Sequence, residues 1–152
     1  MIAQYATFVM AAILIVAMAL EVRTGRIPNW LTLLPVALFV AVAVSVADFS
    51  VLYPQLALGV GVFLFGLVLF AISGIGAGAV KLMAGLALFV PLDKALLTLA
   101  VFLAAFFVSS FIIVQVRKVI GSEESKWHML SRGVLPMSIP IGIAGLSAFF
   151  LL

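Results

Sequence analysis

Apolar residues in this chain run in long stretches that short polar connections separate. A helix needs about 20 apolar residues to cross a hydrocarbon core of about 30 Å. Six stretches bounded by charged residues or proline follow this pattern, although the fourth is shorter than the others. They cover residues 2–20, 30–47, 56–73, 80–91, 95–116 and 133–152. The pattern predicts an all-α polytopic membrane protein, a bundle of six transmembrane helices that forms a single domain over residues 1–152.

The composition agrees with this prediction and excludes soluble proteins. Of the 152 residues, 67% are hydrophobic and 9% are charged, whereas soluble domains average about 25% charged residues. So few charges cannot cover a water-soluble globule, which excludes a soluble enzyme and a nucleic-acid-binding module. The chain has no cysteine, which excludes disulfides and thiolate metal sites. Membrane lipid is therefore the first partner that the sequence implies.

Basic residues are concentrated in alternate connections. The second and fourth connections contain Lys94 alone, and the first, third and fifth contain the other seven of the eight lysine and arginine residues. Because cytoplasmic connections are enriched in lysine and arginine, we expect the odd-numbered connections to face the cytoplasm. Both termini are then expected to lie outside.

The first connection is the most specific segment of the chain and reads EVRTGRIPNWLT from Glu21 onward. Pro28 can stop the preceding helix, and Asn29 can cap the next one. Glu21 needs more explanation, because a carboxylate at the end of a span is costly unless it is hydrated, paired or protonated. Two interpretations follow: an interfacial carboxylate near Arg23 or Arg26, or a functional acid.

The third connection is rich in glycine and reads SGIGAGAVKLMA from residue 73 onward. Gly76 and Gly78 allow positive φ angles and a close approach of two backbones, which suits a tight turn that dips into the bundle. Packing of small residues between helices is the simpler interpretation. Lys81 lacks the preceding glycine and the following serine or threonine of a phosphate-binding loop, so no nucleotide site is predicted.

Together, these two segments resemble the motifs of the type IV prepilin peptidases, in particular the short form that processes Flp-type pilins of Tad pili. The first motif of that family looks like D-x-R-x-x-x-I-P-N. Glu21, Arg23 and Asn29 stand at matching positions, with Ile27 and Pro28 between them.

The second motif of the family looks like G-x-G-D-x-K. Gly76, Gly78, Ala79 and Lys81 stand at its positions. A looser similarity covers the proline-led run at residues 135–140, which opens the last apolar stretch.

The resemblance implies a membrane aspartic endopeptidase of the bacterial inner membrane that cuts the leader of a Flp-type prepilin at the cytosolic membrane face. Its partners would be the leader and the hydrophobic helix of that prepilin, and no metal or cofactor is implied. Glu21 and Ala79 stand where the family has its two catalytic aspartates. The residues expected to surround the substrate are Arg23, Asn29, Gly76, Gly78 and Lys81.

The departures from the family pattern concern the catalytic groups themselves. An aspartic protease needs two carboxyl groups close enough to share a proton, and Ala79 has none. We therefore expect this chain to be catalytically impaired or inactive, whether alanine at this position is natural or engineered. A noncatalytic protein that binds prepilin or assists pilus assembly is the alternative. A small transporter subunit is less supported, because no ionisable residue lies in the middle of a span.

Overall fold

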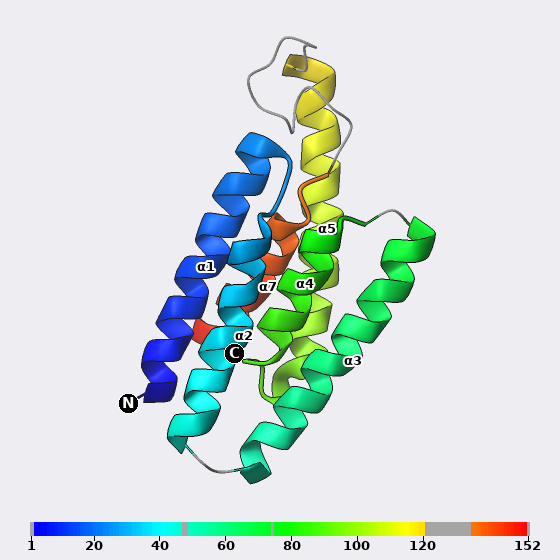
Figure 1. Ribbon diagram of the computed structural model, residues 1–152. Coiled ribbons are helices and arrows are strands. Elements are labelled where there is room, and N and C mark those ends of the chain that lie inside the picture. Colours follow the sequence, from blue (N-terminus) through cyan, green and yellow to red (C-terminus); the bar gives the residue numbers. More distant parts are fainter. Residues whose placement is uncertain (1, 47–48, 74, 121–134, 152) are drawn as a thin grey trace.

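Six α-helices make up the described part of the protein, which a computed structural model gives for residues 2–46, 49–73, 75–120 and 135–151 (Figure 1). The all-α prediction is therefore confirmed, and no strand occurs in these ranges. The helices are α1 (Ile2–Thr24), α2 (Asn29–Val46), α3 (Phe49–Ser73), α4 (Ala77–Ala87), α5 (Leu92–Ile120) and α7 (Ser138–Phe150).

Four of these helices, α1, α2, α3 and α5, are long and apolar enough to cross a membrane. The other two are shorter, with 11 residues in α4 and 13 in α7. α4 begins inside the glycine-rich segment but ends at Ala87, so it does not reach the length of a full span. The side of the membrane on which the termini lie stays a prediction.

Pro54 does not bound the third helix as the sequence pattern suggested. The third predicted stretch begins after Pro54, yet α3 already begins at Phe49 and continues through this proline. α2 likewise continues through Pro35. A proline removes one backbone hydrogen bond of the helix. In a membrane bundle, groups on neighbouring helices can bind the carbonyl group that is left free, so the helix continues.

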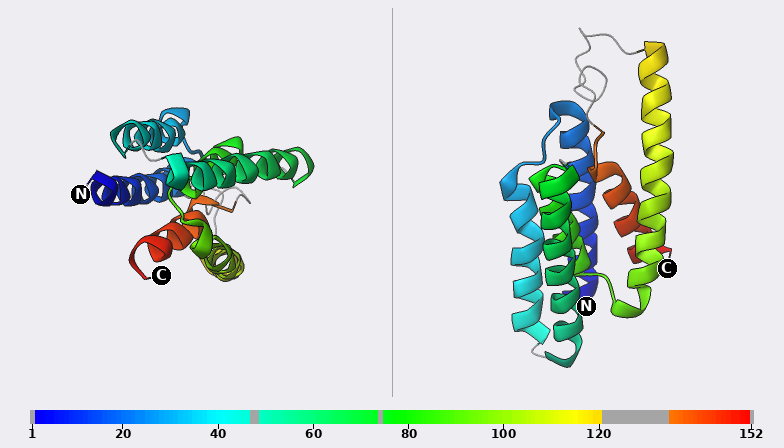
Figure 2. Two further views of the ribbon diagram at one scale, coloured as in Figure 1. Left: turned by 90° about the horizontal axis from the view of Figure 1, so that it is seen from below. Right: turned by 90° about the vertical axis from the view of Figure 1, so that its right-hand side faces the viewer.

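The two short helices pack with α1 at the centre of the buried core. α4 packs against α2, α3 and α7, and α7 lies between α1 and α5 (Figure 2). Leu82 of α4 and Ile141 of α7 are fully buried together with Met10 and Leu14 of α1. α3 and α5 instead expose many apolar side chains, as expected of helices that face lipid.

One end of the bundle gathers the two segments that carry the sequence motifs. The C-terminal ends of α1, α3 and α5 and the N-terminal ends of α2, α4 and α7 all lie at this end (Figure 1). The first connection and the start of α4 are therefore neighbours in space although a complete helical hairpin separates them in the sequence.

Gly85 allows α4 to approach α2 closely. A Cβ atom at this position would lie 2.8 Å from Cβ and 3.1 Å from Cγ of Pro35. The proline ring cannot rotate away, so we expect Gly85→Ala to lower the free energy of unfolding by about 1–3 kcal/mol. Gly61→Ala is the matched control, because nothing lies within 4 Å of its added Cβ atom. Thermal unfolding in detergent measures both, and equal midpoints for the two variants would contradict this packing.

Candidate functional site

The first connection begins with a glycine that ends α1. Gly25 has φ 70°, in the left-handed region that favours glycine. Its N–H donates to the carbonyl oxygen of Glu21 at 2.7 Å. At the other end of the connection, the carbonyl oxygen of Pro28 accepts from the N–H of Leu31 at 3.1 Å, and α2 follows. The connection is thus short and held at both ends.

Asn29 differs from its predicted role. It is the first residue of α2 and not the residue before the helix, which would be the capping position. Its Oδ1 atom accepts a hydrogen bond from Nζ of Lys81 at 3.0 Å. The side chain therefore joins the first connection to α4.

The start of α4 packs directly on the first connection. A Cβ atom at Gly78 would lie 3.0 Å from both Cβ and the carbonyl oxygen of Ile27, so only glycine fits there without a shift. Gly76 behaves differently, since nothing lies within 4 Å of a Cβ atom added to it. Its backbone is extended, with φ −61° and ψ 136°, and does not need glycine. The predicted close approach thus depends on Gly78 and not on Gly76.

Glu21 lies inside the bundle and not at its surface. Its side chain is 8% exposed, and Oε2 accepts a hydrogen bond from the backbone N–H of Ser138 at 2.6 Å. Arg23 and Arg26, the expected partners of an interfacial carboxylate, are both exposed. The carboxylate therefore has a partner from the first residue of α7, which is 117 residues away.

Ser138 is a site residue that sequence reasoning missed. The proline-led run at residues 135–140 marks the beginning of α7, but nothing in it indicates which distant side chain meets the first N–H group. The link between Glu21 and α7 is visible only in three dimensions.

Ala79 lies in the first turn of α4 and is 2% exposed. It belongs to the same apolar cluster as Leu14, Ala17 and Leu31. Asp93, the only other acid among the described side chains, lies in the first turn of α5 at the opposite end of the bundle. The described part of the site therefore offers one carboxylate, and it contains no group of residues that could hold a metal ion.

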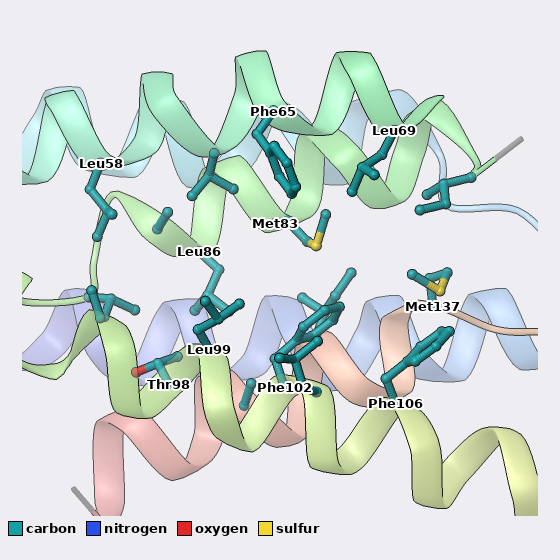
Figure 3. Close-up of a pocket in the computed structure, with 18 residues that line it drawn as sticks. Leu58, Phe65, Leu69, Met83, Leu86, Thr98, Leu99, Phe102, Phe106 and Met137 are labelled. Carbon is teal, nitrogen blue, oxygen red and sulfur yellow. The ribbon is translucent and has the colours of Figure 1, made fainter. Parts of the chain in front are cut away.

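An apolar cavity of about 280 Å³ lies between α3, α4, α5 and α7 (Figure 3). Among the described residues that line it, Thr98 alone is polar, and its hydroxyl donates within α5 to the carbonyl oxygen of Lys94 at 2.9 Å. Ile75 and Met137 line the cavity too, and they directly precede Gly76 and Ser138. The lining of this cavity, called the groove below, therefore includes residues that lie just before the starts of α4 and α7.

Comparison with protein families gives one match. Residues 8–114 match the family model of the type IV leader peptidases. The matched part includes Glu21, the first connection and the whole of α4, so it contains both segments that meet at the site. α7 lies beyond it. Comparisons with curated proteins and with solved structures found no match.

The contact between the first connection and α4 can be tested by cross-linking, because the chain contains no cysteine of its own. We expect the double variant Ile27→Cys/Gly78→Cys to form an internal disulfide on mild oxidation. The two Cβ atoms would start 3.0 Å apart, close to the separation of about 3.5–4.5 Å in disulfides. Ile27→Cys/Gly61→Cys is the control and should keep free thiols. Mass spectrometry and thiol labelling measure the outcome, and free thiols in both variants would contradict the contact.

Proposed function

Because this chain belongs to the type IV leader peptidase family, we propose that it is a single-domain, multi-pass protein of the bacterial inner membrane that recognises Flp-type prepilins at the cytosolic face. We further propose that it is catalytically impaired or inactive as an aspartic endopeptidase. Glu21 and Ala79 occupy the two catalytic positions in this proposal. The observation that carries it is the meeting of two motif segments beside an apolar groove.

The contacts at the end of the bundle support this choice of site. Ile27 packs on Gly78, and Asn29 accepts a hydrogen bond from Lys81, so the two segments hold each other in place. Glu21 lies near the end of α1, before the first connection, and Ala79 directly follows Gly78 at the start of α4. Groups from two such segments could act on one peptide bond.

The groove supports the second half of the proposal, which concerns the substrate. A prepilin would place its hydrophobic helix between α3 and α5, where the cavity is lined by apolar side chains. The polar leader would continue beyond Ile75 and Met137 toward the site. Arg23, Asn29 and Lys81 would then meet the leader outside the apolar region.

The missing carboxyl group supports impaired catalysis. One carboxylate can accept a proton from water, but a second acid must protonate the substrate carbonyl at the same time. Ala79 offers only a methyl group among apolar neighbours. The extra methylene of Glu21, compared with aspartate, also moves its carboxylate by about one bond length.

A noncatalytic prepilin-binding protein is the second candidate, and the same groove favours it. Such a protein would keep the apolar cavity and could lose the second acid without cost. A transporter subunit is not favoured, because the cavity between α3, α4, α5 and α7 has no ionisable residue in its lining.

Cleavage of a Flp-type prepilin in liposomes tests the catalytic proposal. We expect the unaltered chain to release no processed pilin and Glu21→Asp/Ala79→Asp to release it. Ala79→Asp alone should be slower than the double variant, on the order of 100-fold, because its first carboxylate is misplaced. Glu21→Asp alone is the control and should be inactive.

Two results would contradict these statements separately. Cleavage by the unaltered chain would contradict the impairment. A double variant that unfolds like the parent in detergent and yet releases no processed pilin would contradict the assignment of the two catalytic positions.

Filling the groove tests the binding proposal independently of cleavage. Ala95 lines the cavity, whereas Ala100 of the same helix is exposed away from it. We expect Ala95→Trp to weaken binding of labelled prepilin by roughly tenfold, equivalent to about 1.4 kcal/mol, and Ala100→Trp to leave binding unchanged. Titration in nanodiscs measures both. An equal affinity for the two variants would contradict binding in the groove.

A further inference from the structure

Among the described residues, every buried hydroxyl group except one donates a hydrogen bond within its own helix. Thr32, Thr98 and Ser147 each donate to a backbone carbonyl three or four residues earlier. Ser138 is fully buried, at 0% exposure, and its Oγ atom has no hydrogen-bond partner in the described part of the chain.

The position of Ser138 explains the exception. A serine inside a helix can donate to a carbonyl of the preceding turn. Ser138 is the first residue of α7, so no helical turn precedes it. A buried hydroxyl without a partner costs free energy, which makes such a group a point where a ligand gains affinity.

The backbone hydrogen bond of the same residue brings an acceptor near the hydroxyl group. The N–H of Ser138 donates to Oε2 of Glu21 at 2.6 Å. Oγ is joined to this nitrogen through Cα and Cβ alone, so it lies within roughly 6 Å of the carboxylate without a hydrogen bond to it. Glu21 is itself buried, and the two residues form a buried polar pair, of which Ser138 directly follows Met137, a residue of the cavity lining.

We infer that Ser138 is a positioning residue that holds one water molecule against the Glu21 carboxylate. The backbone N–H fixes the orientation of the carboxylate, and the hydroxyl donates to the water, which in turn donates to the carboxylate. A site of this kind meets the general requirement that a buried water has several polar partners. The inference rests on the proposed function only for its catalytic meaning, since that reaction consumes a water molecule at a carboxylate.

Thermal unfolding of the full chain in detergent gives the first test. Ser147→Ala is the matched control, because Ser147 is also a buried serine of α7 but donates to the carbonyl oxygen of Ala144 at 2.8 Å. We expect Ser138→Ala to lower the midpoint by several degrees and Ser147→Ala to change it little. An unchanged or raised midpoint for Ser138→Ala would overturn the inference, because removal of an unsatisfied hydroxyl stabilises a protein.

Infrared difference spectroscopy gives the second test, with a signal that a merely structural role would not change. Bands lost in Glu21→Gln identify its carboxylate. We expect Ser138→Ala to shift these bands and to remove a water O–H stretching band that responds to heavy-oxygen water, while Ser147→Ala changes neither. Spectra in which no water band depends on Ser138 would overturn the inference. Ser138→Cys, of similar volume but a weak donor, carries the same test if the alanine variant does not fold.

The two proposals fail in different ways. A chain that binds no prepilin but keeps the Ser138-dependent bands overturns the proposed function alone. A chain that binds prepilin but lacks these bands overturns only the bound water.

Discussion

A carboxylate inside an apolar bundle must find its hydrogen-bond donors in the protein, because lipid tails offer none. Glu21 finds one in the backbone of α7, where the N–H of Ser138 lies 2.6 Å from Oε2. The first turn of a helix has N–H groups without partners inside the helix. The carboxylate of Glu21 therefore gains a donor, and the N–H of Ser138 gains an acceptor. This bond fixes the end of α1 against the start of α7, and α4 packs against α7 on the same core. The arrangement of the candidate site depends on it.

Much of the fold could be predicted because a helix that crosses a lipid bilayer needs about 20 successive apolar residues. Long apolar runs and their spacing correctly indicated the six helices of the described ranges, four of them long enough to span a membrane, and the alternate connections correctly placed the two motif segments at one end. Helix limits were harder to predict. Pro54 was expected to precede a helix and instead lies inside α3, since contacts with neighbouring helices decide whether a proline is tolerated. The end of α4 at Ala87 likewise has no marker in the apolar run that contains it.

In the site, too, features carried by a local motif could be predicted, whereas those that depend on residues distant in the sequence could not. The pairing of the first connection with α4 was predictable from its motifs, and Gly78 has the close contact expected of a glycine there. The roles of Gly76 and Asn29 were not predictable, because each depends on what lies opposite in space. Gly76 faces open space, and Asn29 meets Lys81. The sequence around Ser138 did not indicate its role, because its contact with Glu21 joins α1 to α7 across 117 residues.

The apolar lining of the groove limits how selectively it can bind the hydrophobic helix of another protein. Acyl chains are as apolar as leucine, so exchanging a lipid tail for a helix in this cavity brings little hydrophobic gain. Selection must then come from shape and from the few polar groups where the cavity ends. The interior of the groove would bind many different hydrophobic helices. The residues around Glu21 and Lys81, which lipid acyl chains do not reach, would then distinguish the correct segment from the others.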